Sequence, residues 1–279
     1  MKKYIKSFVI SAFTLTALIG CGNQAASNDS KDTQTVKLGL IGSDTDVWDD
    51  VKARLADEGI TLEYVSFTDY NQPNAALNEG EVDLNSFQHQ IFLDNYNAEH
   101  GTDLVSIGNT VNAPLGIYSD KLKDVKELGK NATVAIPNDV TNGGRALLLL
   151  QSAGLIKVDE AKGHTPTLSD ITENKLNLAI TELDASQTAR ALQDVDISVI
   201  NSGVAVDAGF LPTQEAIFLE PVDESSKSYV NIIVARKEDE NNDLYQKIVD
   251  AYQTEETAKV IEETSKGSSI PAWETFGRK

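Results

Sequence analysis

Short apolar runs alternate with segments of helical periodicity along most of this sequence. Apolar runs bounded by Gly, Pro or polar residues predict buried strands, and apolar residues at helical spacing predict amphipathic helices. We predict strands over residues 36–41, 60–67, 82–87, 104–107, 116–119, 133–136, 176–183, 197–200, 216–219 and 229–235. We predict helices over residues 46–58, 73–80, 91–100, 125–128, 145–153, 186–192 and about 240–265. Strands separated by helices are typical of βαβ units.

The alternation of strand and helix begins a second time near Pro114. A chain of 279 residues is long enough to bury more than one core, because large chains divide into domains. We therefore expect an α/β fold with two lobes, each a mainly parallel sheet flanked by helices. Lobe 1 is expected to comprise approximately residues 36–113 and 203–279, and lobe 2 residues 114–202. The chain would then cross between the lobes near residues 112–114 and 201–203.

The first twenty residues have the pattern of a secretory signal peptide. Three lysines precede an uncharged run over residues 7–20, which is shorter than the roughly 20 apolar residues that a membrane-spanning helix needs. The run ends in Leu-Ile-Gly-Cys, which resembles a bacterial lipobox. We therefore expect residues 1–20 to be removed and Cys21 to carry the lipid. The alternative is an ordinary signal peptide followed by a chance cysteine.

Cys21 is the only cysteine of the chain, so the mature protein can form no internal disulfide and no cysteine-based metal site. Residues 21–35 are small and polar, without apolar periodicity, and are expected to form a flexible tether. Such a protein would be anchored by its lipid to the outer, extracytoplasmic face of the cell membrane.

The charge and the motifs exclude several classes of function. Asp and Glu number 43 against 24 Lys and Arg, a net charge of −19 that repels nucleic acid. The hydrolase motif G-x-S-x-G, the phosphate-binding motif G-x-x-x-x-G-K-[ST] and the zinc motif H-E-x-x-H do not occur. The histidines, His89, His100 and His164, are scattered rather than spaced as metal ligands. We expect no metal and no cofactor.

A polar loop over residues 137–144 follows one predicted strand and leads into an apolar helix. Thr141 or Asn142 is expected to cap that helix, whose first N–H groups favour an anion. Arg145 adds a planar guanidinium that suits a carboxylate. The alternative is a structural loop in which Arg145 pairs with an acidic residue of the surface.

Two further polar clusters, over residues 67–74 and 85–89, contain Tyr70, Phe87 and His89. Each is expected to follow a strand and precede a helix, where α/β sheets place ligand groups. Aromatic rings beside amides suit a ligand with an apolar tail and a polar head. Alternatively, Phe87 belongs to the core and His89 is a hydrogen-bonded structural residue. Two asparagines, Asn201 and Asn231, follow or interrupt apolar strands and need a backbone or ligand partner.

Long phrases of this sequence resemble the MetQ/NlpA family of methionine-binding lipoproteins, the substrate-binding subunits of ABC importers. They are FTDYNQPNAALNEGEVDLNSFQH, YSDKLKDVKEL, VAIPNDVTNGGRALLLLQSAGLI, VDISVIN and YVNIIV, and they occur in order from about residue 36 to 253. The resemblance implies a periplasmic-binding-protein-like fold in which two lobes close on the ligand. It implies a permease and its ATPase as partners, and binding rather than catalysis.

The resemblance also implies roles for individual residues. Arg145 would hold the ligand carboxylate, with Asn142 shaping that end of the site, and Asn201 and Asn231 would hold the amino-acid backbone. The walls of the pocket for the thioether side chain would be formed by Tyr70, Phe87 and His89, with Trp48 as a further candidate.

Two departures from the family pattern leave the ligand open. Residues 112–113 are Asn-Ala before Pro114, and the loop GSDTDVW over residues 42–48 is acidic. L-methionine is the leading ligand, and D-methionine, a methionine-containing dipeptide or another amino acid are alternatives. A rival of another class is a surface-anchored small-molecule enzyme that would use His89 with Asp69 as an acid–base pair.

Overall fold

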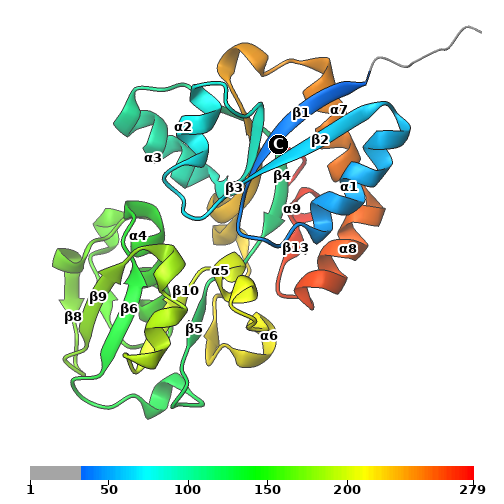
Figure 1. Ribbon diagram of the computed structural model, residues 1–279. Helices are drawn as coiled ribbons and strands as arrows, with labels where there is room; N and C mark the ends of the chain where they lie inside the picture. Colours follow the sequence, from blue (N-terminus) through cyan, green and yellow to red (C-terminus); the bar gives the residue numbers. More distant parts are fainter. Residues whose placement is uncertain (1–32) are drawn as a thin grey trace, which may run out of the picture. The chain divides into compact units, whose positions relative to one another are not determined.

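The computed structural model describes residues 33–279, which form two larger β-sheets with helices packed on them (Figure 1). The first sheet has the strand order β13-β4-β12-β3-β1-β2. Its strands are β1 (Gln34–Ile41), β2 (Ile60–Phe67), β3 (Leu84–His89), β4 (Val105–Asn112), β12 (Val230–Ala235) and β13 (Ile270–Pro271).

The second sheet has the strand order β11-β5-β10-β6-β9. Its strands are β5 (Gly116–Tyr118), β6 (Thr133–Pro137), β9 (Ala179–Leu183), β10 (Ile197–Ile200) and β11 (Phe218–Leu219). A separate hairpin joins β7 (Lys157–Val158) and β8 (Ile171–Glu173). Because β11 pairs with β5, the second sheet continues past residue 202, and the expected crossing near 201–203 is wrong. The chain returns to the first sheet only between β11 and β12, and the remaining lobe boundaries stay a prediction.

Both sheets are mixed rather than mainly parallel, which corrects the expectation from the sequence. Strand β1 pairs in parallel with β2 and β3, whereas β12 runs antiparallel to β3 and β4. In the second sheet β6 is parallel to β9 and β10, whereas β5 is antiparallel to β10 and β11. Strands β5 and β12 are the first that the chain forms on entering a sheet from the other one. No helical crossover within the sheet therefore dictates their direction.

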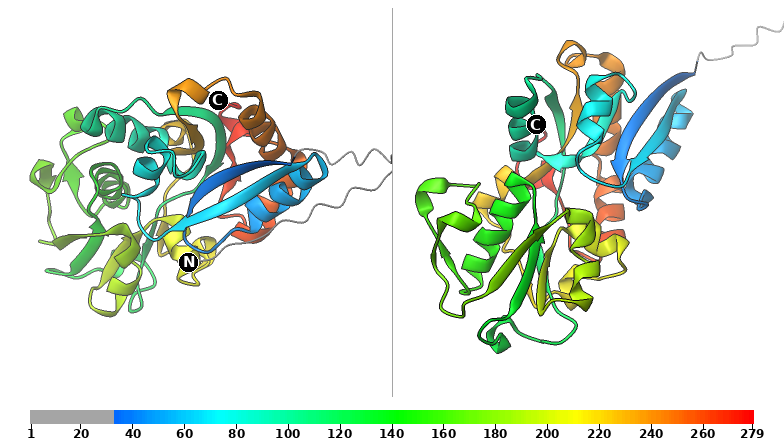
Figure 2. Two further views of the ribbon diagram at one scale, coloured as in Figure 1. Left: turned by 45° about the horizontal axis from the view of Figure 1, so that its top comes forward. Right: turned by 60° about the vertical axis from the view of Figure 1, so that its left-hand side comes forward.

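Helices cover both faces of the first sheet. The helices are α1 (Asp46–Asp57), α2 (Pro73–Asn78), α3 (Gln90–His100), α4 (Val140–Ser152), α5 (Ser202–Asp207), α6 (Pro212–Glu215), α7 (Asp243–Tyr252), α8 (Glu255–Ser265) and α9 (Ala272–Thr275). Helices α1, α7 and α8 gather on one side of the first sheet and α2 and α3 on the other (Figure 2). Helix α4 packs on the second sheet. Both sheets therefore have buried faces, as their apolar strands require.

Each sheet has its own apolar core. In the first, the side chains of Leu38, Leu55 and Ile248 join strand β1 to the helices on one face, and Leu77 and Leu93 bury the other face. The second core contains Ile117, Val134, Leu147, Leu150 and Val199, all buried. The apolar helix predicted over residues 145–153 is part of this core, since these leucines belong to α4.

Several predicted element boundaries are corrected. Helix α4 begins at Val140 and its cap is Asp139, not Thr141 or Asn142, because the Asp139 carboxylate accepts the Asn142 N–H at 2.9 Å. The segment predicted as one helix over about 240–265 is two helices, because Thr254 caps a new one. The helix predicted over 186–192 consists of 3₁₀ turns at Ala185–Gln187 and Arg190–Gln193.

The expectations for the amino-terminal segment fall mostly outside the described residues. The signal peptide over 1–20 and Cys21 lie there, as does most of the tether predicted over 21–35. Strand β1 begins at Gln34, two residues inside the predicted tether, because the backbone N–H of Gln34 donates to Gly59 O at 3.0 Å. Within residues 33–279, no helix is both long and apolar enough to span a membrane.

Candidate functional site

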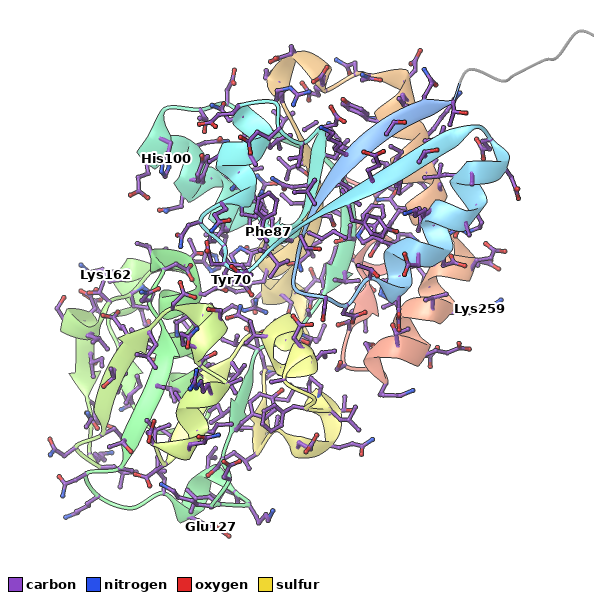
Figure 3. All side chains as sticks on the ribbon, in the orientation of Figure 1. Tyr70, Phe87, His100, Glu127, Lys162 and Lys259 are labelled. Atoms are coloured by element: carbon purple, nitrogen blue, oxygen red, sulfur yellow. The ribbon has the colours of Figure 1, made fainter. Side chains whose placement is uncertain are left out.

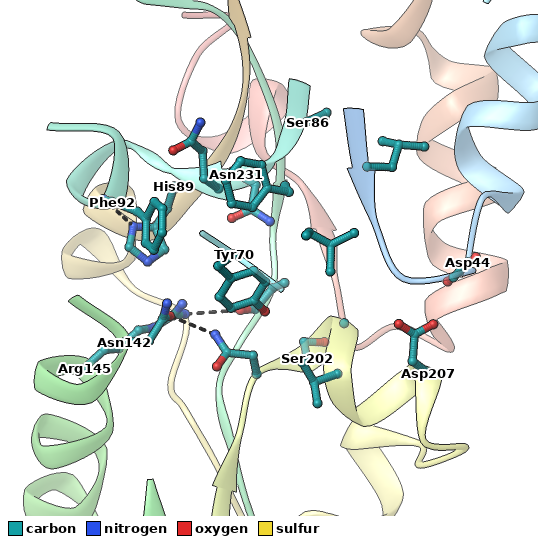
Figure 4. A pocket seen from close by; sticks show the side chains of 18 of the residues that line it. Asp44, Tyr70, Ser86, His89, Phe92, Asn142, Arg145, Ser202, Asp207 and Asn231 are labelled. Carbon is teal, nitrogen blue, oxygen red and sulfur yellow. Dashed lines mark hydrogen bonds between the residues drawn. The ribbon is translucent and has the colours of Figure 1, made fainter. Parts of the chain in front are cut away.

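A cavity with a volume of about 210 Å³ lies between the two sheets. This volume is far larger than that needed by one water molecule, about 10–15 Å³. Strands β1, β3 and β12 and helix α3 contribute to one side, and helices α4 and α5 to the other. Figure 4 shows Asn142 and Arg145 on α4 facing His89 and Asn231 across the cavity, with Tyr70 between them. The cavity is lined by every binding residue predicted from the sequence: Tyr70, Phe87, His89, Asn142, Arg145, Asn201 and Asn231.

Three aromatic rings form one wall of this cavity. The ring centroids of Tyr70 and Phe87 are 5.9 Å apart, and Phe92 completes the group at 6.1 Å from Tyr70 and 5.7 Å from Phe87. Figure 3 shows Phe87 on the first sheet, with Tyr70 close to it on the side that faces the second sheet. Phe87 lies within β3, in agreement with the strand predicted over 82–87, but the cluster over residues 85–89 belongs to this strand and does not follow it. Such rings favour an apolar or sulfur-containing group.

Sequence reasoning missed Phe92, although a signal for it was present. Phe92 follows His89 by three positions across the start of α3, a spacing that places two side chains on one side of a helix. Trp48 belongs to the first core in addition to lining the cavity for which it was a candidate. Its ring packs against Tyr252 at a centroid distance of 4.7 Å in the first core, and its side chain also lines the cavity.

His89 is held as a neutral hydrogen-bond donor. Its Nδ1 accepts the backbone N–H of Phe92 at 3.1 Å and thereby caps α3, so the proton of the neutral ring must reside on Nε2. Burial lowers the pKa of His89 to about 3, the charge of Arg145 adds to this lowering, and the nearby side chain of Asn142 opposes it. Among the described residues Nε2 has no hydrogen-bond partner, although it is buried. This N–H group is therefore available to a ligand.

Arg145 is 4% exposed and contacts the segments that connect the two sheets. Its Nε donates to Glu220 Oε1 at 2.9 Å, its Nη2 pairs with Glu220 Oε2, and Nη2 also donates to Ala113 O at 3.1 Å. The guanidinium carbon lies 4.3 Å from the centroid of the Tyr229 ring. Pairing with an acidic residue, the alternative considered for Arg145, therefore occurs in this structure, while the same side chain lines the cavity.

Asparagine side chains line the cavity from both sheets. Asn201 Nδ2 donates to Asn142 Oδ1 at 2.8 Å, which leaves Asn201 Oδ1 buried and, among the described residues, without a partner. Asn231 pairs with His89 in the register of β12 and β3 and lines the opposite side. Because an unpaired buried carbonyl oxygen costs free energy, Asn201 Oδ1 is ready to accept a hydrogen bond from a bound molecule.

The other histidines do not line this cavity. His164 Nδ1 is 3.2 Å from the hydroxyl of Tyr229. His100 stacks on Tyr96, and Figure 3 shows His100 at the outer end of α3. Residues 33–279 contain no group of three or more His, Cys, Asp or Glu side chains arranged to hold a metal ion. The acid–base pair of His89 and Asp69 is not formed, because Asp69 accepts from Asn71 and Gln72 while His89 Nδ1 accepts from Phe92.

Comparison with known proteins agrees with this arrangement. Residues 36–273 match the model of the NlpA lipoprotein family, which covers most of the chain. The chain belongs to the NlpA lipoprotein family. The predicted family and the predicted α/β fold are thereby confirmed. The NlpA relatives reported below are named as binding proteins, so the expectation of a binding protein rather than an enzyme is confirmed for the family.

Three relatives of this NlpA family member are informative. The protein named probable D-methionine-binding lipoprotein MetQ of Vibrio cholerae is 41% identical over 277 residues, 98% of this chain and 100% of that protein. A nutrient binding protein from Burkholderia cenocepacia, solved bound to methionine, is 42% identical with a TM-score of 0.81, covering 85% of this chain and 99% of that one. The substrate binding protein of a methionine transporter from Streptococcus pneumoniae is 45% identical with a TM-score of 0.81, covering 86% and 96%.

Proposed function

We propose that this chain is a lipid-anchored substrate-binding protein that captures L-methionine, or a close relative, and delivers it to an ABC importer. The observation that carries the proposal is the composition of the cavity between the sheets. The Arg145 cation stands beside three aromatic rings, together with the Nε2–H of His89 and Asn201 Oδ1, which have no partner within residues 33–279.

Each part of a methionine zwitterion has a counterpart in this cavity. The carboxylate needs a cation and donors, which Arg145 and His89 supply. The ammonium group needs acceptors, which Asn201 and Asn231 supply. The thioether chain needs an apolar wall that tolerates sulfur, which Tyr70, Phe87 and Phe92 supply. The names of the relatives support the same ligand.

The proposed mechanism is a shift of population between open and closed forms. A ligand that contacts α4 on one side and β3 on the other makes its full set of contacts only when the two sheets are close, so it favours the closed form. The closed form would then dock on a membrane permease that a cytoplasmic ATPase drives. A lipid on Cys21 would hold the protein on the extracytoplasmic face of the membrane.

Native mass spectrometry of freshly purified protein tests the ligand directly, because tightly bound molecules remain attached. We expect a mass increment equal to that of methionine. Titration calorimetry with L-methionine, D-methionine and a methionine-containing dipeptide then ranks the candidates, and D-methionine is included because of the relative from Vibrio cholerae. An absence of heat with all three ligands, using protein refolded to remove any bound molecule, would refute the proposal.

A further inference from the structure

Asp139 and two asparagines form a chain of hydrogen bonds that ends at the cavity. Asn142 Nδ2 donates to both carboxylate oxygens of Asp139, each at 3.1 Å. Asn201 Nδ2 donates in turn to Asn142 Oδ1 at 2.8 Å. Asn201 Oδ1 is the last atom of this series of hydrogen bonds, and it is buried with no partner among the described residues.

The direction of this chain follows from the chemistry of its first member. A carboxylate ion only accepts hydrogen bonds, so Asn142 must turn its NH₂ group toward Asp139 and its oxygen away from it. The oxygen of Asn142 also only accepts, so Asn201 must present its NH₂ group to Asn142. One orientation of both amides satisfies all these bonds, and it leaves the oxygen of Asn201, a residue that lines the cavity, as a buried acceptor without a partner among the described residues.

We propose that Asp139 is a positioning residue that fixes, through Asn142, the amide of Asn201 with its oxygen toward the cavity, so that the site selects ligands with an N–H donor there. The proposal rests on the function proposed above, and it adds the origin of the selection for the ligand amino group. Asp139 itself lies outside the cavity lining and acts through its two neighbours.

Without the Asp139 carboxylate, the two amides are free to rotate together. Asn142 can then offer its NH₂ group to Asn201, and Asn201 can turn its own NH₂ group toward the ligand. An NH₂ group does not accept a hydrogen bond from an ammonium ion, so discrimination between ligands with and without the amino group falls.

The test compares the affinity for L-methionine with that for its des-amino analogue, which lacks only the α-amino group. Asp139 also caps α4 by accepting the Asn142 backbone N–H, so the variant Asp139→Ser is chosen because serine keeps a capping oxygen. The matched control is Asp159→Ser, another capping aspartate in the same lobe, which accepts the Ala161 N–H at 3.0 Å and does not line the cavity.

We expect the wild type and Asp159→Ser to share the same preference for methionine over the analogue. Asp139→Ser should lower that preference about tenfold or more, mainly by lowering the affinity for methionine. A hydrogen bond to a charged group contributes about that factor to affinity. In an Asn201→Ala background the substitution at Asp139 should leave the preference unchanged, because Asp139 acts through Asn201. If Asp139 had a purely structural role, its substitution would lower the affinity for methionine and for the analogue by the same factor.

An unchanged preference in Asp139→Ser overturns the inference, as does an equal further loss in the Asn201→Ala background. If Asp139→Ser does not fold, as judged by circular dichroism, Asp139→Gly takes its place, because glycine is tolerated at an N-cap and offers no side-chain acceptor, and it must shift the preference in the same direction. Failure of the wild type to bind methionine would refute the proposed function instead, so the two failures are distinguishable.

Discussion

Glu220 forms an ion pair with Arg145 through both of its carboxylate oxygens, although the two residues lie 75 positions apart. The carboxylate of Glu220 also accepts the backbone N–H of Leu115 at 3.0 Å, and its side chain is 17% exposed. Glu220 therefore fixes the guanidinium of Arg145 in position in the absence of a ligand. Such preorganisation lowers the entropic cost of binding a second carboxylate.

Arg145→Ala should remove most of the affinity for methionine. The ligand carboxylate loses its charged partner, and the partly buried Glu220 is left without a cation, so we expect a loss of about 100-fold or more by titration calorimetry. The control is Arg190→Ala, an exposed arginine of the same lobe outside the cavity lining, which should bind as the wild type does. Near-wild-type binding by Arg145→Ala would remove this residue from the site.

The neutral state of His89 predicts how stability depends on pH. Burial lowers the pKa of His89 to about 3 in the folded chain, from an ordinary value of 6.5. Between these values the unfolded chain takes up a proton that the folded chain does not, so the free energy of unfolding falls as the pH falls below about 6.5. Above that pH His89 makes no pH-dependent contribution.

The variant His89→Asn isolates this contribution, because asparagine can still cap α3 but does not titrate. Urea unfolding at several pH values from about 7.5 to about 4.5 should show a smaller loss of stability on acidification in the variant. The difference in slope should reach about 1.4 kcal/mol per pH unit. Parallel pH profiles would show that His89 is not the group responsible.

Gly144 is expected to be intolerant of a side chain. A Cβ at this position of α4 would lie 2.7 Å from His164 O and 2.8 Å from Thr165 Cα, which are backbone atoms that cannot rotate away. Gly144→Ala should therefore cost about 1–3 kcal/mol of stability in urea unfolding, in spite of the better helix propensity of alanine. Gly129→Ala is the control, because a Cβ there meets nothing within 4 Å. Equal stability of the two variants would contradict the prediction.

Lipid attachment at Cys21 is tested by growing cells with labelled palmitate. The wild type should incorporate the label and fractionate with membranes, whereas Cys21→Ala should remain unlabelled, because only the thiol can form the thioether to diacylglycerol. Equal labelling of both proteins would refute the lipobox interpretation and favour an ordinary signal peptide.

Much of the fold follows from local patterns in the sequence. Strands such as 60–67 and 197–200 have their predicted bounds, because each is a short apolar run between clear turn signals. The direction of β5 and β12 could not be predicted, because it depends on which sheet the chain has just left. The break between α7 and α8 was missed because apolar residues continue at helical spacing on both sides of Thr254.

The residues of the cavity could be named from the sequence, and their partners could not. Polar side chains near strand ends, together with the family resemblance, selected seven residues that the structure brings to one cavity. Glu220 was missed because an acidic residue in a chain with 43 of them carries no local signal. The sequence did not identify Asp139 as the N-cap of α4, because Thr141 and Asn142, two and three positions later, have side chains that cap helices equally well.

The two connections between the sheets meet at one side chain. Arg145 donates to Ala113 O in the segment between β4 and β5, and it contacts Glu220 and Tyr229 at the two ends of the segment between β11 and β12. If one sheet rotates relative to the other, these two connecting segments must change conformation, and the contacts of the Arg145 guanidinium must change with them. The guanidinium that we propose to bind the ligand carboxylate therefore contacts both segments that would have to bend if the sheets moved apart.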